Sequence, residues 1–147
     1  MCLTSDRKAT AKLLAKYKPN ELVPIYKYVK SGSGGTKLKA PIKSYTYKPG
    51  LIEIGLDPKI RREYNQQTKG IHAYLRKASA VESSEGNETL TWVRLYAVAD
   101  SLFGVAKNGG HAVFGTVILK KSDFDDAISR LANKAAESER AGWVDDV

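Results

Sequence analysis

The chain has little of the residue types that build disulfides, metal centres and membrane spans. Its 147 residues include one cysteine and two histidines. One cysteine excludes an internal disulfide, and a metal held by two histidines would need Asp or Glu as further ligands. No apolar run approaches the ~20 residues of a membrane helix, and the first residues show no signal-peptide core. These absences favour a cytoplasmic protein, whether in a cell or in an infected cell, without membrane, metal or cofactor.

Acidic residues are scarce in the first third of the chain. Residues 1–50 hold 11 Lys and Arg against two acids, Asp6 and Glu21. Residues 51–100 hold seven of each sign, and residues 101–147 hold six basic against seven acidic residues. The whole net charge of +8 therefore originates in the first third. Such asymmetry favours an anionic partner over a merely soluble surface, although a solvated lysine face would give the same counts.

The pattern of apolar residues predicts a single α+β domain over 1–147. Its length and 42% apolar content suffice for one core. Helices are expected at 6–17, capped by Ser5, at 59–67, and at about 123–140. Strand-like runs rich in β-branched and aromatic residues occupy 22–30, 42–47, 51–55, 70–75, 89–98, 102–106 and 111–120. Because no regular helices separate these six or seven strands, we expect a mostly antiparallel sheet with N-terminal and C-terminal helices.

The two histidines lie in similar segments, GIHAYL and GGHAVF. In two-histidine phosphoesterases, a hydroxyl residue two positions after each His helps to hold a phosphate on the same strand face. The matching residues here are Tyr74, which can donate a hydrogen bond, and Val113, which cannot. The pattern is half broken, and His72 and His111 can equally be local structural residues.

Cys2 offers a second catalytic reading. If Met1 is removed, its thiol stands beside a free α-amine, as in N-terminal nucleophiles. His72 or His111 would then orient or activate Cys2 in a hydrolase or transferase. An inert terminal thiol is the alternative.

The glycine-rich segment GSGGTK does not match a nucleotide-binding P-loop, because the lysine and threonine follow the wrong order. Gly32 and Gly35 fit a G-x-x-G pattern between lysines. The nucleic-acid loop of that pattern joins helices, whereas this segment joins strands, so the indication is weak.

Tyrosines alternate with lysines in the basic third. Tyr pairs on one strand face can stack nucleobases while lysines hold phosphates. Tyrosine also suits half-buried strands without any ligand. The residues that would bind an anionic ligand are Lys27, Lys30, Lys37, Lys39, Lys43, Tyr26, Tyr28, Tyr45 and Tyr47.

Short motifs within residues 1–80 resemble small proteins of bacteriophages and large DNA viruses, a family with no assigned activity. They are MCL (1–3), IYK (25–27), AP (40–41), YKPG (47–50) and GIHA (70–73). The resemblance implies a viral origin and supplies no catalytic residues.

The sequence thus predicts a small non-enzymatic protein that binds single-stranded nucleic acid or a phosphorylated nucleotide. A hydrolase or transferase that uses Cys2 is the alternative. A virion component, or an inhibitor that binds an acidic host protein, is a third class. The sequence does not indicate the oligomeric state.

Overall fold

The computed structural model describes residues 3–32, 37–40, 46–54, 66–67 and 70–145. The α+β fold with a mostly antiparallel sheet is confirmed. Among the described residues, no helix is both long enough and apolar enough to cross a membrane.

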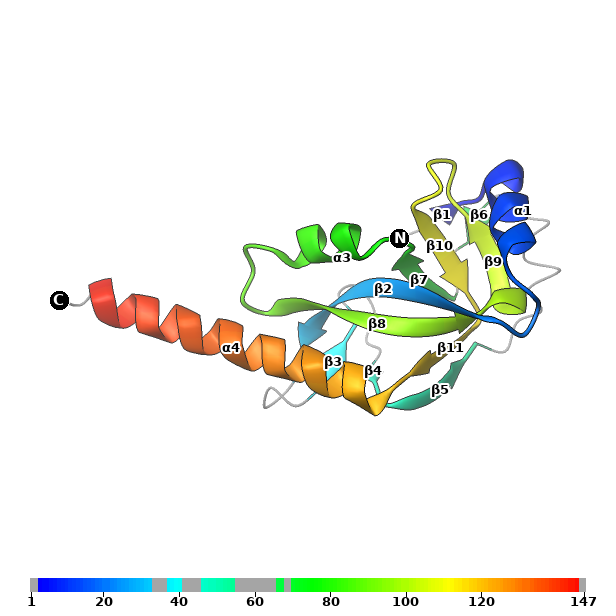
Figure 1. Cartoon of the computed structure of the whole chain (residues 1–147). Coiled ribbons are helices and arrows are strands. Elements are labelled where there is room, and N and C mark those ends of the chain that lie inside the picture. The colour runs from blue at the N-terminus through cyan, green and yellow to red at the C-terminus, as the bar shows by residue number, and fades with distance from the viewer. Residues whose placement is uncertain (1–2, 33–36, 41–45, 55–65, 68–69, 146–147) are drawn as a thin grey trace.

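Within the described residues, the main sheet has nine strands, all paired antiparallel (Figure 1). Seven follow in the order β5 (Gly50–Glu53), β11 (Thr116–Leu119), β8 (Leu90–Val98), β2 (Leu22–Ser31), β7 (Ile71–Tyr74), β10 (His111–Phe114) and β9 (Leu102–Val105). Two short strands, β3 (Leu38–Lys39) and β4 (Thr46–Tyr47), extend from β2. The short strands β1 (Leu3–Thr4) and β6 (Gln66–Gln67) pair separately. The sequence predicted only six or seven strands, because strands of two residues are too short to show an alternating pattern.

The sheet curls strongly at Gly115. This residue alone separates β10 from β11, yet the two strands have different neighbours, so the chain passes from one part of the sheet to another. The Gly115 N–H donates to Ser101 O at 2.8 Å, and a Cβ there would lie 2.9 Å from the Phe103 ring. A side chain would therefore crowd this corner. One face of the curled sheet, the inner face, encloses the main core.

The inner face takes every second residue of the long strands. In β8, residues 91, 93, 95 and 97 are buried, whereas residues 90, 92, 94, 96 and 98 are half-buried on the outer face. The predicted alternation over 89–98 is confirmed. Valines, leucines and isoleucines from seven strands join one apolar cluster on the inner face.

Helix α1 (Arg7–Lys16) closes one end of this core. Its N-cap is Asp6 rather than Ser5, because the Asp6 carboxylate accepts the Ala9 N–H at 2.9 Å. Ala9, Leu13 and Tyr17 pack against the core, so the predicted buried stripe is confirmed.

The other helices depart from expectation. Helix α3 (Lys77–Ser84) was not predicted, and it packs against β2, β7 and β8. The predicted helix 59–67 lies mostly outside the described residues, and its end, residues 66–67, is strand β6. Helix α4 (Lys121–Asp145) runs further than predicted at both ends, and beyond β8 it extends away from the sheet (Figure 1).

Candidate functional site: the outer face of the sheet

Strand register aligns aromatic and basic residues across the outer face. Directly paired residues of antiparallel strands lie on the same face. Arg94 pairs with Tyr26, Tyr26 with Tyr74, and Tyr74 with His111. This ring row therefore crosses β8, β2, β7 and β10.

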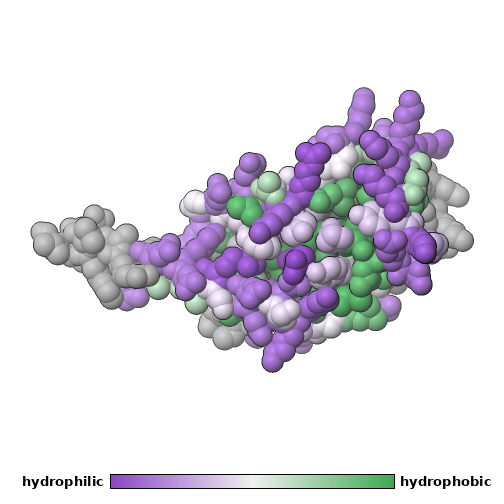
Figure 2. All heavy atoms as spheres, viewed as in Figure 1, coloured by the Kyte–Doolittle hydropathy of each residue, from purple (hydrophilic) through white to green (hydrophobic). Residues whose placement is uncertain are grey.

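A second row, the apolar row, crosses the other side of the same face. Pro24 pairs with Tyr96, Tyr96 with Ile118, and Ile118 with Leu51. Leu51 is 62% exposed. Figure 2 shows a green apolar area over β11 and β5, bordered by hydrophilic side chains. The outer face thus carries aromatic and basic side chains along the ring row and mostly apolar side chains along the apolar row.

The histidines lie together at the β7–β10 end. The rings of His72 and His111 have centroids 6.0 Å apart, and the Tyr74 ring stacks on His111 at 5.2 Å. Both ring nitrogens of His72 are buried, so a substrate in solvent cannot reach them. The Tyr74 hydroxyl accepts a hydrogen bond from Ser83 at 3.1 Å. Val113 packs with Phe103 in a small apolar cluster and offers no hydroxyl, as the sequence indicated.

Burial lowers the pKa of His111, and the positive charge of Lys27 lowers it further. His111 is therefore held in its neutral form to a lower pH than a free histidine. Within the described residues, no group of three potential ligands is arranged to hold a metal ion. The geometry accounts for the two histidines as half-buried rings, tilted toward each other, with Tyr74 stacked on His111.

Lys27 has a structural contact that the sequence did not reveal. Strands β2 and β7 pair only at Tyr26 and Tyr74, so they diverge beyond that point. The Lys27 ammonium donates to His72 O at 2.6 Å across the gap. Lys27 was predicted to hold a ligand phosphate, and this contact ties its ammonium to the protein backbone instead.

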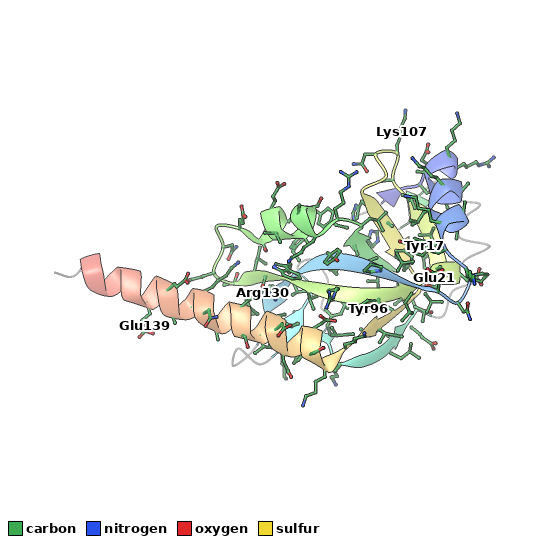
Figure 3. All side chains as sticks on the ribbon, in the orientation of Figure 1. Tyr17, Glu21, Tyr96, Lys107, Arg130 and Glu139 are labelled. Atoms are coloured by element: carbon green, nitrogen blue, oxygen red, sulfur yellow. The ribbon has the colours of Figure 1, made fainter. Side chains whose placement is uncertain are left out.

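Cations lie over the aromatic rings of β8. Arg130 lies 3.8 Å and Lys77 4.6 Å from the centre of the Trp92 ring, and Lys120 lies 4.4 Å from that of Tyr96. Arg94 is 5.5 Å from the Tyr96 ring. In Figure 3, Tyr96 lies at β8, and Arg130 lies at α4 where this helix passes β8.

Arg94 is held by a buried carboxylate. Its guanidinium donates to Asp123 at 3.0 Å, and the Arg94 side chain remains 43% exposed while that of Asp123 is 7% exposed. The hydrogen bond to Asp123 raises the pKa of Arg94, although partial desolvation opposes this effect. Arg94 is thus a fixed cation with an open side, between Tyr26 and Tyr96.

The predicted lysine–tyrosine surface is only partly assembled. Tyr26 and Tyr28 share the outer face as expected, and the Tyr28 ring stacks on Tyr74 at 6.4 Å. Tyr47 is 4% exposed and belongs to the core, so its predicted role in stacking is wrong.

The remaining predicted residues divide between exposed positions and undescribed ones. Lys30 and Lys37 are exposed, and Lys39 is half-buried on β3. Cys2, Lys43 and Tyr45 lie outside the described residues, so their predicted roles stay predictions.

The sequence reasoning missed the β8 residues and the cations that accompany them. Alternation over 89–98 already placed Trp92, Arg94 and Tyr96 on one face. Their cations come from Lys77, Lys120 and Arg130, which lie far from β8 in the sequence. Only the tertiary structure brings these groups together.

Comparison with known proteins gives no match. No protein-family model matches the sequence, and no curated protein or solved structure is significantly similar to it. The resemblance to phage and viral proteins therefore stays a prediction.

Proposed function

We propose that the outer face of the sheet binds single-stranded nucleic acid or a phosphorylated nucleotide. The observation that carries the proposal is the group of Tyr26, Arg94, Tyr96 and Lys120. Two rings on adjacent strands flank a partly exposed guanidinium, and the Lys120 ammonium lies over the Tyr96 ring. A nucleobase stacks on a tyrosine ring, while Arg and Lys hold the adjoining phosphate.

The arrangement suits a flexible, flat ligand better than a compact one. Single-stranded binding proteins combine stacking rings with a basic path for the backbone, and sheet faces serve this purpose. Here Arg94 is held in place by Asp123, so little conformational entropy is lost when it meets a phosphate. The basic first third of the chain, which includes exposed Lys30 and Lys37, adds long-range attraction.

The test is a fluorescence anisotropy titration of labelled oligo(dT), oligo(U) and ATP over a salt series. Tyr96→Leu keeps apolar bulk and removes the ring, and we expect it to weaken oligonucleotide binding roughly 5- to 100-fold. Lys120→Gln should lower the slope of log affinity against log salt by about 1.

Lys107→Gln is the matched control, because it removes the same charge from an exposed residue at the β9–β10 turn, away from Tyr96 (Figure 3). It should change affinity much less than Lys120→Gln. Absence of salt-dependent binding to all three ligands would refute the proposal. Equal losses from Lys107→Gln and Lys120→Gln would show binding by net charge alone, without this site.

A further inference from the structure

Three edges of the sheet lie at β9, at the part of β8 beyond β11 and at β5, and contacts within the chain close the first two. At β9, the Val105 N–H donates to the Thr10 hydroxyl at 3.1 Å, and Val105 O accepts the Asp6 N–H at 2.7 Å. At β8, the part beyond β11 is closed by α4: Arg130 donates to Trp92 O, and Lys134 donates to Leu90 O at 2.6 Å. Three side chains and the Asp6 backbone N–H thus satisfy backbone groups that a neighbouring strand would otherwise bind.

The third edge is the outer side of β5. The Ile54 N–H donates to Gly115 O at 2.7 Å, and Ile52 pairs with Val117 of β11. Because hydrogen-bonding direction alternates along a strand, Leu51 and Glu53 direct their backbone N–H and C=O groups outward. Among the residues that the structure describes, none is recorded as a partner of these four groups.

We propose that β5 is an interface at which two copies of this chain pair edge to edge, antiparallel, about a two-fold axis. With Leu51 opposite Glu53 of the second copy, each copy's two outward N–H groups meet the other's two C=O groups. All four outward groups of each copy are then satisfied. A two-residue offset in one direction would bring Pro49, which has no N–H, into the pairing, and an offset in the other direction would place Glu53 directly opposite Glu53 of the second copy.

The charge and apolar pattern of the edge favours a second copy over another strand. Glu53 would face Leu51 rather than a second carboxylate, so like charges are kept apart. The two Leu51 side chains would be diagonal neighbours, and each is 62% exposed in one copy alone. The apolar row of Pro24, Tyr96 and Ile118 would continue through this contact into its symmetry copy. Basic residues, which discourage edge pairing, are absent from β5 (Gly50–Glu53).

The test combines sedimentation velocity over a concentration series with amide hydrogen exchange of β5. The full chain should self-associate, and the Leu51 and Glu53 amides should become protected as concentration rises. Leu51→Lys should weaken dimerisation at least ~10-fold by placing two lysines at the contact. Leu22→Lys is the matched control, since Leu22 is an exposed leucine on β2, 40% exposed, and should leave dimerisation unchanged.

A second variant, Glu53→Pro, removes one outward N–H without removing a hydrogen bond to β11, and should also weaken dimerisation. A monomer at all concentrations would overturn the proposal. So would amides protected equally at every dilution, because the chain itself would then cover the edge. Self-association that survives Leu51→Lys would place the interface elsewhere.

Discussion

The two ends of the outer face use aromatic rings in different ways. At the β7–β10 end, rings contact rings: Tyr74 stacks on His111, and His111 approaches His72. At the β8–α4 end, rings contact cations, with Arg130 over Trp92 and Lys120 over Tyr96. In the first arrangement, the ring faces contact one another within the fold. The second places cations over rings, and of the cations near Tyr96, Lys120 is exposed and the Arg94 side chain is 43% exposed, which is why we assign ligand binding to that end.

The tight packing of the β7–β10 end predicts the largest effect on stability. Gly70 has φ +106°, and a Cβ there would lie 2.5 Å from Val113 Cγ1 and 2.8 Å from the Phe103 ring. Gly70→Ala combines backbone strain with overpacking, and should lower the free energy of unfolding by about 3 kcal/mol or more. Urea denaturation measures the loss.

Gly109→Ala separates the two causes. Gly109 also has positive φ, +73°, but a Cβ there would meet nothing within 4 Å. It should cost only the backbone term, about 1 kcal/mol. Equal losses for the two variants would show that Val113 and Phe103 yield to the added methyl group.

The next effect tests whether Arg130 closes the β8 edge. Arg130→Met keeps an apolar stem over Trp92 and removes the hydrogen bonds to Trp92 O and Thr91 Oγ1. A part-buried carbonyl loses its partner, so stability should fall by about 1–3 kcal/mol. Glu137→Met, an exposed position further along the same helix, should change stability by less than about 0.5 kcal/mol. If both variants unfold at the same urea concentration, α4 does not stabilise this edge.

Much of the framework could be predicted from the sequence, because strand alternation and helix stripes are local patterns. The alternation over 89–98 and the stripe of Ala9, Leu13 and Tyr17 both correspond to the structure. The candidate site was less predictable, because the basic residues and tyrosines of the first third do not all face the same surface. Tyr47 points into the core and Lys27 reaches a backbone carbonyl, and neither fact follows from charge or spacing.

Helix α3 shows the same limit. Its sequence, KASAVESS, has serines and few large apolar residues, so local propensity suggested a turn at its end. Its packing against β2 and β8 stabilises it as a helix, and it brings Lys77 to Trp92. The order of strands likewise depends on the curl at Gly115, which the strand-like run 111–120 did not indicate.

A smaller effect concerns the β7–β10 end, where His111 should make the free energy of unfolding depend on pH. In the folded protein the pKa of His111 is lowered, whereas in the unfolded chain it is near ~6.5. Between these values the unfolded state binds a proton that the folded state does not, so stability falls as pH decreases through this window. His111→Gln should flatten the fall in unfolding free energy as the pH is lowered below about 6.5, relative to the native chain. An unchanged slope would mean that other groups cause it.

Among the variants of the candidate site, Lys120→Gln should have the smallest effect on stability. A small stability loss would distinguish Lys120 from Arg130, whose substitution should destabilise the fold. Lys120 is exposed, and its ammonium contacts only the Tyr96 ring among the interactions recorded for it. An exposed cation–ring contact contributes about 0.5–1 kcal/mol at most, so Lys120→Gln should scarcely move the urea midpoint. The same variant should reduce the salt dependence of oligonucleotide binding. If Lys120→Gln instead destabilises the fold as much as Arg130→Met, the cations of β8 are all structural, and the two ends of the outer face do not differ in kind.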